Sequence, residues 1–448
     1  MLSQNIKLSG FLNDLLIYAN KSITPVSIVI FVVYFTPFTM GEFIPVVSSF
    51  YYQITWILIS ILFLFNYRAI LNHKRAFRTN YFMPTILFAA SFFVSMFMGE
   101  GYSDLTEYTK YDSTFGGVLK DVIMFVPMQL LLIYFIYLSI QTKSDLKKVI
   151  YSFLKIGAVV NFIGLSIFFI YKGTEMRGLE GRLGATFTDP NYLGRFEILL
   201  IVISLSAILI IKDKRYLLLN LANISISTFI LFLTFSRSAI ITLMLSIVII
   251  LLTMKNRLIK TSIILLVCIF SIILLLYVGT KRTSDDVIAG QSSAPTGTVD
   301  YSSTTRIALN YAAVLMFLDY PVFGVGYHNF YNIYINRSYL PVDIPLASHI
   351  SVVHSWLFSV LAEQGIFGLI VFLYILFLVF RKLFVNYRRA DDEEMKFYGL
   401  VLFCMFFVLI FNGLFFPVFF TELLFSLLLG IISAYFRISE NLKIESRE

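Results

Sequence analysis

Residues 355–380 read SWLFSVLAEQGIFGLIVFLYILFLVF, with Glu363 as the one charged side chain. A helix needs about 20 consecutive apolar residues to cross the roughly 30 Å hydrocarbon core of a bilayer. This run is longer than that, so it predicts a membrane-spanning helix that crosses with some tilt.

The same pattern recurs along the whole chain. Of its 448 residues, 58% are hydrophobic and 14% are charged, and the mean hydropathy is +0.83, whereas soluble domains carry about 25% charged residues. This composition excludes a water-soluble globule and a disordered chain, and it predicts an all-α polytopic membrane protein with residues 1–448 in a single membrane domain. About 12 transmembrane helices are expected, at 23–40, 43–66, 80–98, 118–140, 149–171, 191–211, 216–233, 238–254, 261–279, 355–380, 397–412 and 418–436.

The positions of Lys and Arg predict the orientation of these spans, because cytoplasmic loops are enriched in both. With the N-terminus inside, the inside segments hold 23 of the 35 basic residues, the outside segments hold nine, and three lie in spans. Both termini are therefore predicted to be cytoplasmic. The longest loop, 280–354, is then extracytoplasmic, and its amphipathic run Ile307–Tyr320 is expected to form a helix on the membrane surface.

The net charge of +8 comes from basic residues in short clusters between apolar runs. That distribution sets topology and predicts no nucleic-acid partner. Cys268 and Cys404 both lie within apolar runs, so no disulfide framework and no metal cluster is expected. No Walker loop, Rossmann fingerprint, nucleophile elbow, HExxH or CxxC motif occurs, so neither a cofactor nor a metal is predicted.

The outside face contains the first candidate site segment, GRLGATFTDPN at 181–191. Asp-Pro-Asn is a signal for the start of a helix, and a helix N-terminus there would direct free N–H groups and a positive dipole end outward. Together with Arg182, this start could form an anion seat. A turn with a solvated Arg182 is the alternative, and the segment by itself favours neither.

Arg237 lies in Ser-Arg-Ser at 236–238, where two apolar spans meet with almost no loop. An Arg at that depth is costly unless it is paired or faces water. It could snorkel to the interface, but the short connection holds it at the membrane, which favours a functional role.

Two more segments complete the set of candidates. Arg306 follows Thr-Thr at the start of the amphipathic loop helix. His354 lies at the border of the span 355–380, where an imidazole can titrate near neutral pH. It could equally cap or anchor the helix. Glu363 follows nine residues later and is expected to face the bundle interior. Nine residues place His354 and Glu363 on opposite faces of a helix, so a direct pair is not expected.

Together these segments resemble the O-antigen ligase and polymerase superfamily, which comprises the Wzy-type polymerases and WaaL-type ligases of bacterial surface polysaccharides. The resemblance extends from Arg182 to Gly368. It rests on the order and spacing of segments 181–191, 236–238, 304–306, YPVFGVGY at 320–327, and His354 with Glu-x-Gly-x-x-Gly at 363–368. Ser355 stands where the family commonly has Asn, and Asn310 where an aromatic residue often follows the loop Arg.

The resemblance implies a GT-C-like fold and an inverting glycosyltransferase that depends on a lipid diphosphate. The donor would be a glycan linked to undecaprenyl diphosphate, the acceptor a second glycan, and a chain-length regulator is a candidate partner besides the lipid bilayer. The site would face the periplasm or exterior from a bacterial plasma (inner) membrane. The implied residues are Arg182, Arg237 and Arg306 for the diphosphate, His354 as base or for acceptor orientation, Asp189 as second candidate for the base, and Asn191 and Glu363 as supporting residues.

Three functions stay open. A polymerase would join lipid-linked repeats for a capsule or lipopolysaccharide, and a ligase would transfer glycan to lipid A–core. The richness in Ile, Lys, Asn and Phe suggests an AT-rich genome, a group that includes many hosts without lipid A, and so favours the polymerase. A flippase of the same lipid-linked glycan would need charges along a path through the bilayer, whereas here they gather at the outer end.

Overall fold

A computed structural model describes residues 24–39, 51–72, 82–98, 115–170, 182–187, 189–211, 217–253, 301–330, 333–334, 339, 353–415 and 423–445. In these ranges the chain is helical and contains no strand. The helices are α2 (Pro25–Thr39), α4 (Tyr51–Asn72), α5 (Phe82–Met98), α6 (Phe115–Ser139), α7 (Lys143–Ile170), α8 (Pro190–Ser206) with the π-helical turn η2 (Ala207–Ile211), α9 (Leu217–Leu233), α10 (Arg237–Leu252), α12 (Tyr301–Asp319), α14 (Trp356–Arg389), α15 (Glu393–Asn412) and α16 (Leu423–Glu445).

Eleven of the twelve expected spans correspond to helices of the structure, and the twelfth, 261–279, lies outside the described residues. Six of these helices are long and apolar enough to cross a membrane, namely those at Val122–Ser139, Lys143–Ile170, Pro190–Ile210, Trp356–Arg389, Glu393–Asn412 and Leu423–Ile444. Five more are apolar but shorter. The polytopic helical class is therefore confirmed, and the count of twelve spans stays a prediction.

Polar side chains set the starts of the helices that matter for the site. Asp189 caps α8 by accepting a hydrogen bond from the Asn191 N–H, and Pro190 occupies the first helical position, where its fixed φ fits and its missing N–H costs nothing. Ser236 caps α10 by accepting from the Ala239 N–H. Both are the sequence signals expected of a helix start.

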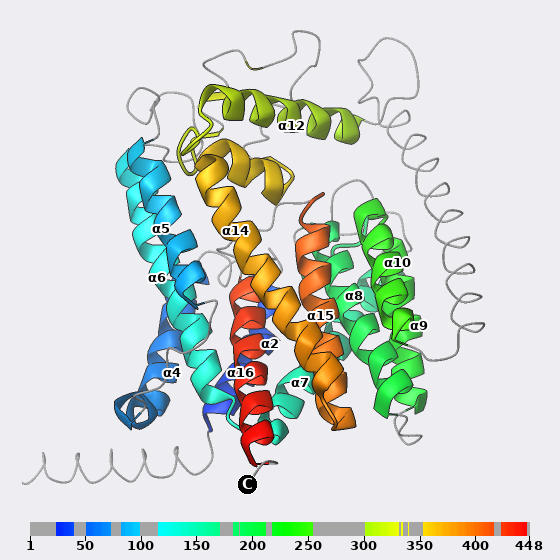
Figure 1. Cartoon of the computed structure of the whole chain (residues 1–448). Coiled ribbons are helices and arrows are strands. Elements are labelled where there is room, and N and C mark those ends of the chain that lie inside the picture. The colour runs from blue at the N-terminus through cyan, green and yellow to red at the C-terminus, as the bar shows by residue number, and fades with distance from the viewer. Residues whose placement is uncertain are drawn as a thin grey trace, which may run out of the picture.

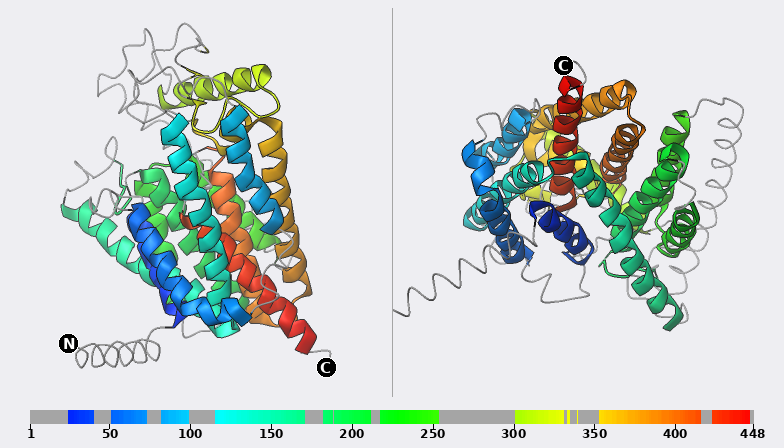
Figure 2. Two further views of the ribbon diagram at one scale, coloured as in Figure 1. Left: turned by 90° about the vertical axis from the view of Figure 1, so that its left-hand side faces the viewer. Right: turned by 90° about the horizontal axis from the view of Figure 1, so that it is seen from below.

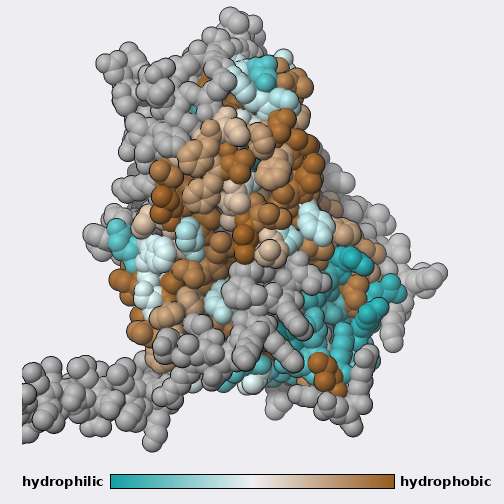
Figure 3. All heavy atoms as spheres, turned by 60° about the vertical axis from the view of Figure 1, so that its left-hand side comes forward, coloured by the Kyte–Doolittle hydropathy of each residue, from teal (hydrophilic) through white to brown (hydrophobic). Residues whose placement is uncertain are grey.

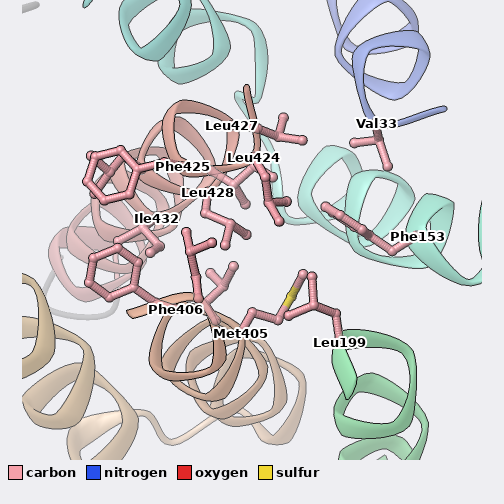
Figure 4. Close-up of a cluster of buried hydrophobic side chains, with 14 of the residues drawn as sticks. Val33, Phe153, Leu199, Met405, Phe406, Leu424, Phe425, Leu427, Leu428 and Ile432 are labelled. Carbon is pink, nitrogen blue, oxygen red and sulfur yellow. The ribbon is translucent and has the colours of Figure 1, made fainter. Parts of the chain in front are cut away.

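The centre of the bundle is built from α15 and α16, which are enclosed by the other spans (Figures 1 and 2). α15 contacts α8, α10, α14 and α16. Figure 4 shows Met405 and Phe406 of α15 directed toward side chains of α16, with Leu199 of α8 beside them. α15 thus lies between the helix that begins at Pro190 and the helix that begins at Trp356.

The outward faces of the bundle are apolar, as a lipid environment requires. Phe162 of α7, Leu218 of α9 and Phe377 of α14 are exposed, and hydrophobic residues cover much of the face shown in Figure 3, with hydrophilic residues gathered toward its lower end. Exposed apolar side chains on this scale favour membrane insertion over a soluble fold.

α12 lies across one end of the bundle, transverse to the spans (Figure 1). Its residues Leu309, Ala312, Ala313 and Met316 follow helical spacing and are buried. They form a small core with Val325, Phe330, Ile333, Tyr334, Val353 and Ala362. The expected amphipathic helix over Ile307–Tyr320 therefore exists, and it begins six residues earlier than predicted.

The opposite end of the bundle joins segments that the sequence predicts to be cytoplasmic. Lys143 at the start of α7 pairs with Asp392 and Glu394 at the start of α15, and Lys382 of α14 lies 2.9 Å from Glu440 of α16. Burial would raise the pKa of Asp392, but the Lys143 ammonium holds this pKa below its ordinary value. The predicted inside loops 141–148 and 381–396 thus share one end, and the candidate site residues lie at the other.

Candidate functional site

The first candidate segment and the Ser-Arg-Ser segment form one hydrogen-bonded cluster. Arg182 is 6% exposed. Its Nε donates to the Thr234 carbonyl at 2.7 Å, and its Nη2 donates to the Asn191 Oδ1 at 3.2 Å. The Ser236 hydroxyl donates to the same Asn191 oxygen at 2.7 Å. Asn191 in turn donates from its side-chain amide to Asp189 at 2.8 Å. The starts of α8 and α10 are therefore fixed against each other.

This cluster changes the interpretation of Arg182 that the sequence left open. The guanidinium is neither solvated nor directed at bulk water, because it joins the α9–α10 turn to the α8 start. The Leu183 N–H, donating to the Leu233 carbonyl at 3.0 Å, adds a second link between the same segments. An arginine held in this way presents its charge at a fixed place, which is what pre-organised anion binding requires.

Arg237 is the first residue of α10 and its side chain is half-buried. Arg237 directly follows Ser236, whose side chain hydrogen-bonds to Asn191 and caps α10. These hydrogen bonds therefore fix the position of the Arg237 backbone. A cation at the start of a helix is disfavoured by the helix dipole. Stability of α10 thus gives no reason for an arginine at this position.

Charges from two segments that are far away in the sequence act on His354. The His354 side chain lies just before α14 and is half-buried. Burial lowers the pKa of His354 to about 4, the charge of Arg306 at α12 lowers it as well, and Asp189 at α8 opposes both. The imidazole is therefore neutral at physiological pH, with a cation and a carboxylate close enough to act on it.

Glu363 lies in the bundle interior, as predicted, but its partners come from another segment. The backbone N–H groups of His328 and Phe330 donate to its carboxylate. The Glu363 carbonyl accepts from the Gly326 N–H at 3.1 Å and from the Ser95 hydroxyl of α5. Glu363 thus anchors the segment that follows α12 onto α14, and so supports the placement of α12 relative to α14 without touching His354.

The segment that follows α12 packs against a break in α14. Gly365 has φ +64° and ψ −161°, and the N–H groups after it, of Ile366 and Phe367, donate to the Pro321 and Val322 carbonyls at 2.9 and 3.2 Å. Gly324, with φ +73°, lies close against the α14 backbone, where an added Cβ would meet atoms of Ala362, Glu363 and Gln364. The two glycine-containing motifs at 320–327 and 363–368 are therefore one structural unit.

Asn412, the last residue of α15, was not singled out from the sequence. It is fully buried, and its amide nitrogen lies 3.4 Å from the Ser238 hydroxyl and 3.5 Å from the Thr242 hydroxyl. The next residue, Gly413, accepts from the Trp356 N–H at 3.0 Å. A lone Asn at the end of an apolar run was the available signal, since polar groups in spans usually face partners in the bundle.

The arrangement collects fixed positive charge, a neutral imidazole and a carboxylate at one end of a membrane bundle. Arg182, Arg237 and Arg306 can stabilise an anion, preferably one with several oxygens such as a diphosphate. His354 can accept a hydrogen bond from a hydroxyl group. These are the parts that a transfer reaction with an anionic leaving group needs.

Residues 222–373 match the family model described as O-antigen ligase. The matched range includes most of α9, all of α10 and α12, and the first half of α14. It contains Arg237, Arg306, His354 and Glu363, while Arg182 precedes it. Comparison with curated proteins finds no match. The family match confirms the resemblance noted in the sequence.

Proposed function

We propose that this multi-pass membrane chain is a surface-polysaccharide polymerase. The match of residues 222–373 to the O-antigen ligase family model supports the proposal. The polymerase joins oligosaccharide repeats carried on undecaprenyl diphosphate by inverting glycosyl transfer. The reaction takes place at the outer face of a bacterial plasma membrane, where the lipid-linked donor and acceptor are both present.

The donor binds through its diphosphate. Arg237 and Arg306 contact the phosphate oxygens. Arg182 adds a further positive charge, which its hydrogen bonds to Thr234 and Asn191 hold in place. The acceptor hydroxyl attacks the anomeric carbon from the face opposite the diphosphate. As the new C–O bond forms, the bond to the diphosphate breaks and its electron pair leaves with undecaprenyl diphosphate, where the guanidinium groups stabilise the developing charge.

His354 orients the attacking hydroxyl and takes its proton. In the free protein the pKa of His354 is about 4, because burial and Arg306 both disfavour the charged form. Bound diphosphate brings negative charge next to Arg306 and offsets its effect on the imidazole. Donor binding therefore raises the pKa of His354 toward the range in which a general base is effective. Asp189, which acts on His354 in the same direction, supports the protonated form.

The single observation that carries the proposal is the hydrogen-bonded cluster that holds the Arg182 guanidinium between the starts of α8 and α10, 2.7 Å from the Thr234 carbonyl and 3.2 Å from the Asn191 Oδ1. The charges of Arg306 and Asp189, from two other segments, also act on His354.

The test uses purified protein in liposomes with undecaprenyl-diphosphate oligosaccharide and no nucleotide sugar. Longer lipid-linked glycan from the wild type, and about 10²- to 10⁴-fold less from a folded His354→Ala variant, is the expected result. Equal elongation by the variant would remove His354 from the mechanism and make Asp189→Asn the next variant to test.

A ligase is the second candidate, favoured by the description of the matching family model. It would form no longer lipid-linked glycan in this assay, and would form product when lipid A–core is added. A flippase would form no new glycosidic bond with either acceptor.

A further inference from the structure

Asn412 lies at the junction of the two halves of the candidate site. Its amide nitrogen is 3.4 Å from the Ser238 hydroxyl and 3.5 Å from the Thr242 hydroxyl, both on α10. The Ser238 hydroxyl is 3.3 Å from the Ser236 hydroxyl, which donates to Asn191. A continuous row of hydrogen-bonding groups thus runs from the α8 start, across the α9–α10 turn, to the end of α15.

The same turn of α15 also holds the start of α14. The Trp356 N–H donates to the Gly413 carbonyl at 3.0 Å, and the Trp356 indole Nε1 donates to the Ile410 carbonyl at 2.9 Å. His354 precedes Trp356 by two residues. The last turn of α15 therefore contacts the arginine-bearing α10 start on one side and the histidine-bearing α14 start on the other.

Fold stability does not explain an asparagine at this position. The Asn412 Oδ1 is buried and has no hydrogen-bond partner among the described residues, and such an oxygen costs folding free energy. A leucine of similar size would remove that cost. It would orphan neither neighbour, because the Ser238 hydroxyl keeps Ser236 and the Thr242 hydroxyl donates to the Ser238 carbonyl at 2.7 Å.

We propose that Asn412 is a positioning residue, which holds the α10 start with Arg237 in register with the α14 start with His354. The inference rests on the proposed function, since it assigns Asn412 to the geometry of the same transfer reaction. Misplacing a base and a leaving-group site by about 1 Å costs roughly 10²-fold in rate, so even a weak lateral hydrogen bond at this junction affects turnover.

The kinetic test compares Asn412→Leu with the wild type in the elongation assay. The expected result is a kcat lower by about tenfold or more, a KM for the donor within about twofold, because the arginines remain, and an unchanged or higher thermal midpoint. An unchanged kcat, or a fall in kcat matched by a loss of folded protein, overturns the proposal.

Asn66 provides a matched control. It is buried, and it donates from its amide to the Ser139 hydroxyl of another helix at 2.9 Å, so it makes the same kind of contact away from the site. Asn66→Leu should leave kcat unchanged. An equal fall in kcat for both variants means that any buried amide between spans has this effect, and overturns the specific role of Asn412.

A distance measurement tests the same inference without activity. Spin labels at Ile241 of α10 and Ser359 of α14, both half-buried, report the spacing of the two helix starts. Asn412→Leu should broaden or shift this distribution, and Asn66→Leu should not. If the wild type makes no longer glycan, the polymerase proposal fails while the distance result still decides on Asn412. An unchanged distribution overturns the positioning role.

Discussion

Gly365→Ala is expected to damage the protein strongly, and the cost can be worked out from the break in α14. Glycine alone adopts φ +64° with ψ −161° without strain, and a non-glycine residue there costs on the order of 1–3 kcal/mol. The added Cβ would lie 2.5 Å from the Val322 oxygen and 2.7 Å from the Gly324 nitrogen. Both are backbone atoms, so the two segments must separate.

Separation weakens the hydrogen bonds that Ile366 and Phe367 donate to the Pro321 and Val322 carbonyls, at about 1 kcal/mol each. The sum is roughly 3–5 kcal/mol, a large part of the 5–15 kcal/mol that typically stabilises a folded domain. The segment after α12 would also move relative to α14, which displaces Arg306 from His354 and should lower elongation by about 10²-fold or more.

Gly164→Ala is the matched control in α7. Its added Cβ would meet the Ala185 and Ile230 side chains at 3.5 Å, an ordinary contact, and alanine favours the helix by up to about 1 kcal/mol. The measurements are the thermal midpoint in detergent and glycan elongation. A Gly365→Ala protein with the same thermal midpoint as the wild type and the same rate of glycan elongation would refute the reasoning from the two glycines.

Four further predictions concern the site and the orientation. Arg237→Lys should lose most elongation activity although the charge is kept, because an ammonium cannot form the bidentate contact; the exposed Arg389→Lys is the control, and normal products from the Arg237 variant would exclude the diphosphate role. Ser236→Ala should lower the thermal midpoint by the equivalent of about 1–2 kcal/mol, since it removes the cap of α10 and the donor to Asn191; an unchanged midpoint would contradict this. The pKa of His354 is lower in the folded protein, about 4 against 6.5, so its contribution to stability is complete above pH 6.5 and is lost as the pH falls toward 4; the thermal midpoint of His354→Gln should fall less than that of the wild type over this window, and parallel curves would count against a buried neutral imidazole. A membrane-impermeant thiol reagent on intact cells should label a cysteine at position 293 and not one at 390, and the reverse pattern would invert the orientation.

The sequence by itself determined the class of the protein, because that class depends on local properties. Long apolar runs predict membrane helices whatever surrounds them, and eleven of the expected spans correspond to helices of the structure. The helix start at Asp189 was predicted from the Asp-Pro-Asn signal, and the structure confirms it. The motifs with Arg182, Arg237, Arg306 and His354 indicated a resemblance that the family match over residues 222–373, which contains the last three, supports.

The tertiary structure decided how those motifs meet. Arg182 bonds to Thr234, Ser236 to Asn191, and Asn412 to Ser238 across 52, 45 and 174 positions, and Glu363 receives its partners from the segment after α12. A capping signal acts within one turn of helix, whereas these contacts exist because α15 packs between α8, α10 and α14. Helix packing depends on the fit of many side chains at once, so no single motif in the chain specifies which buried polar groups will share a hydrogen bond.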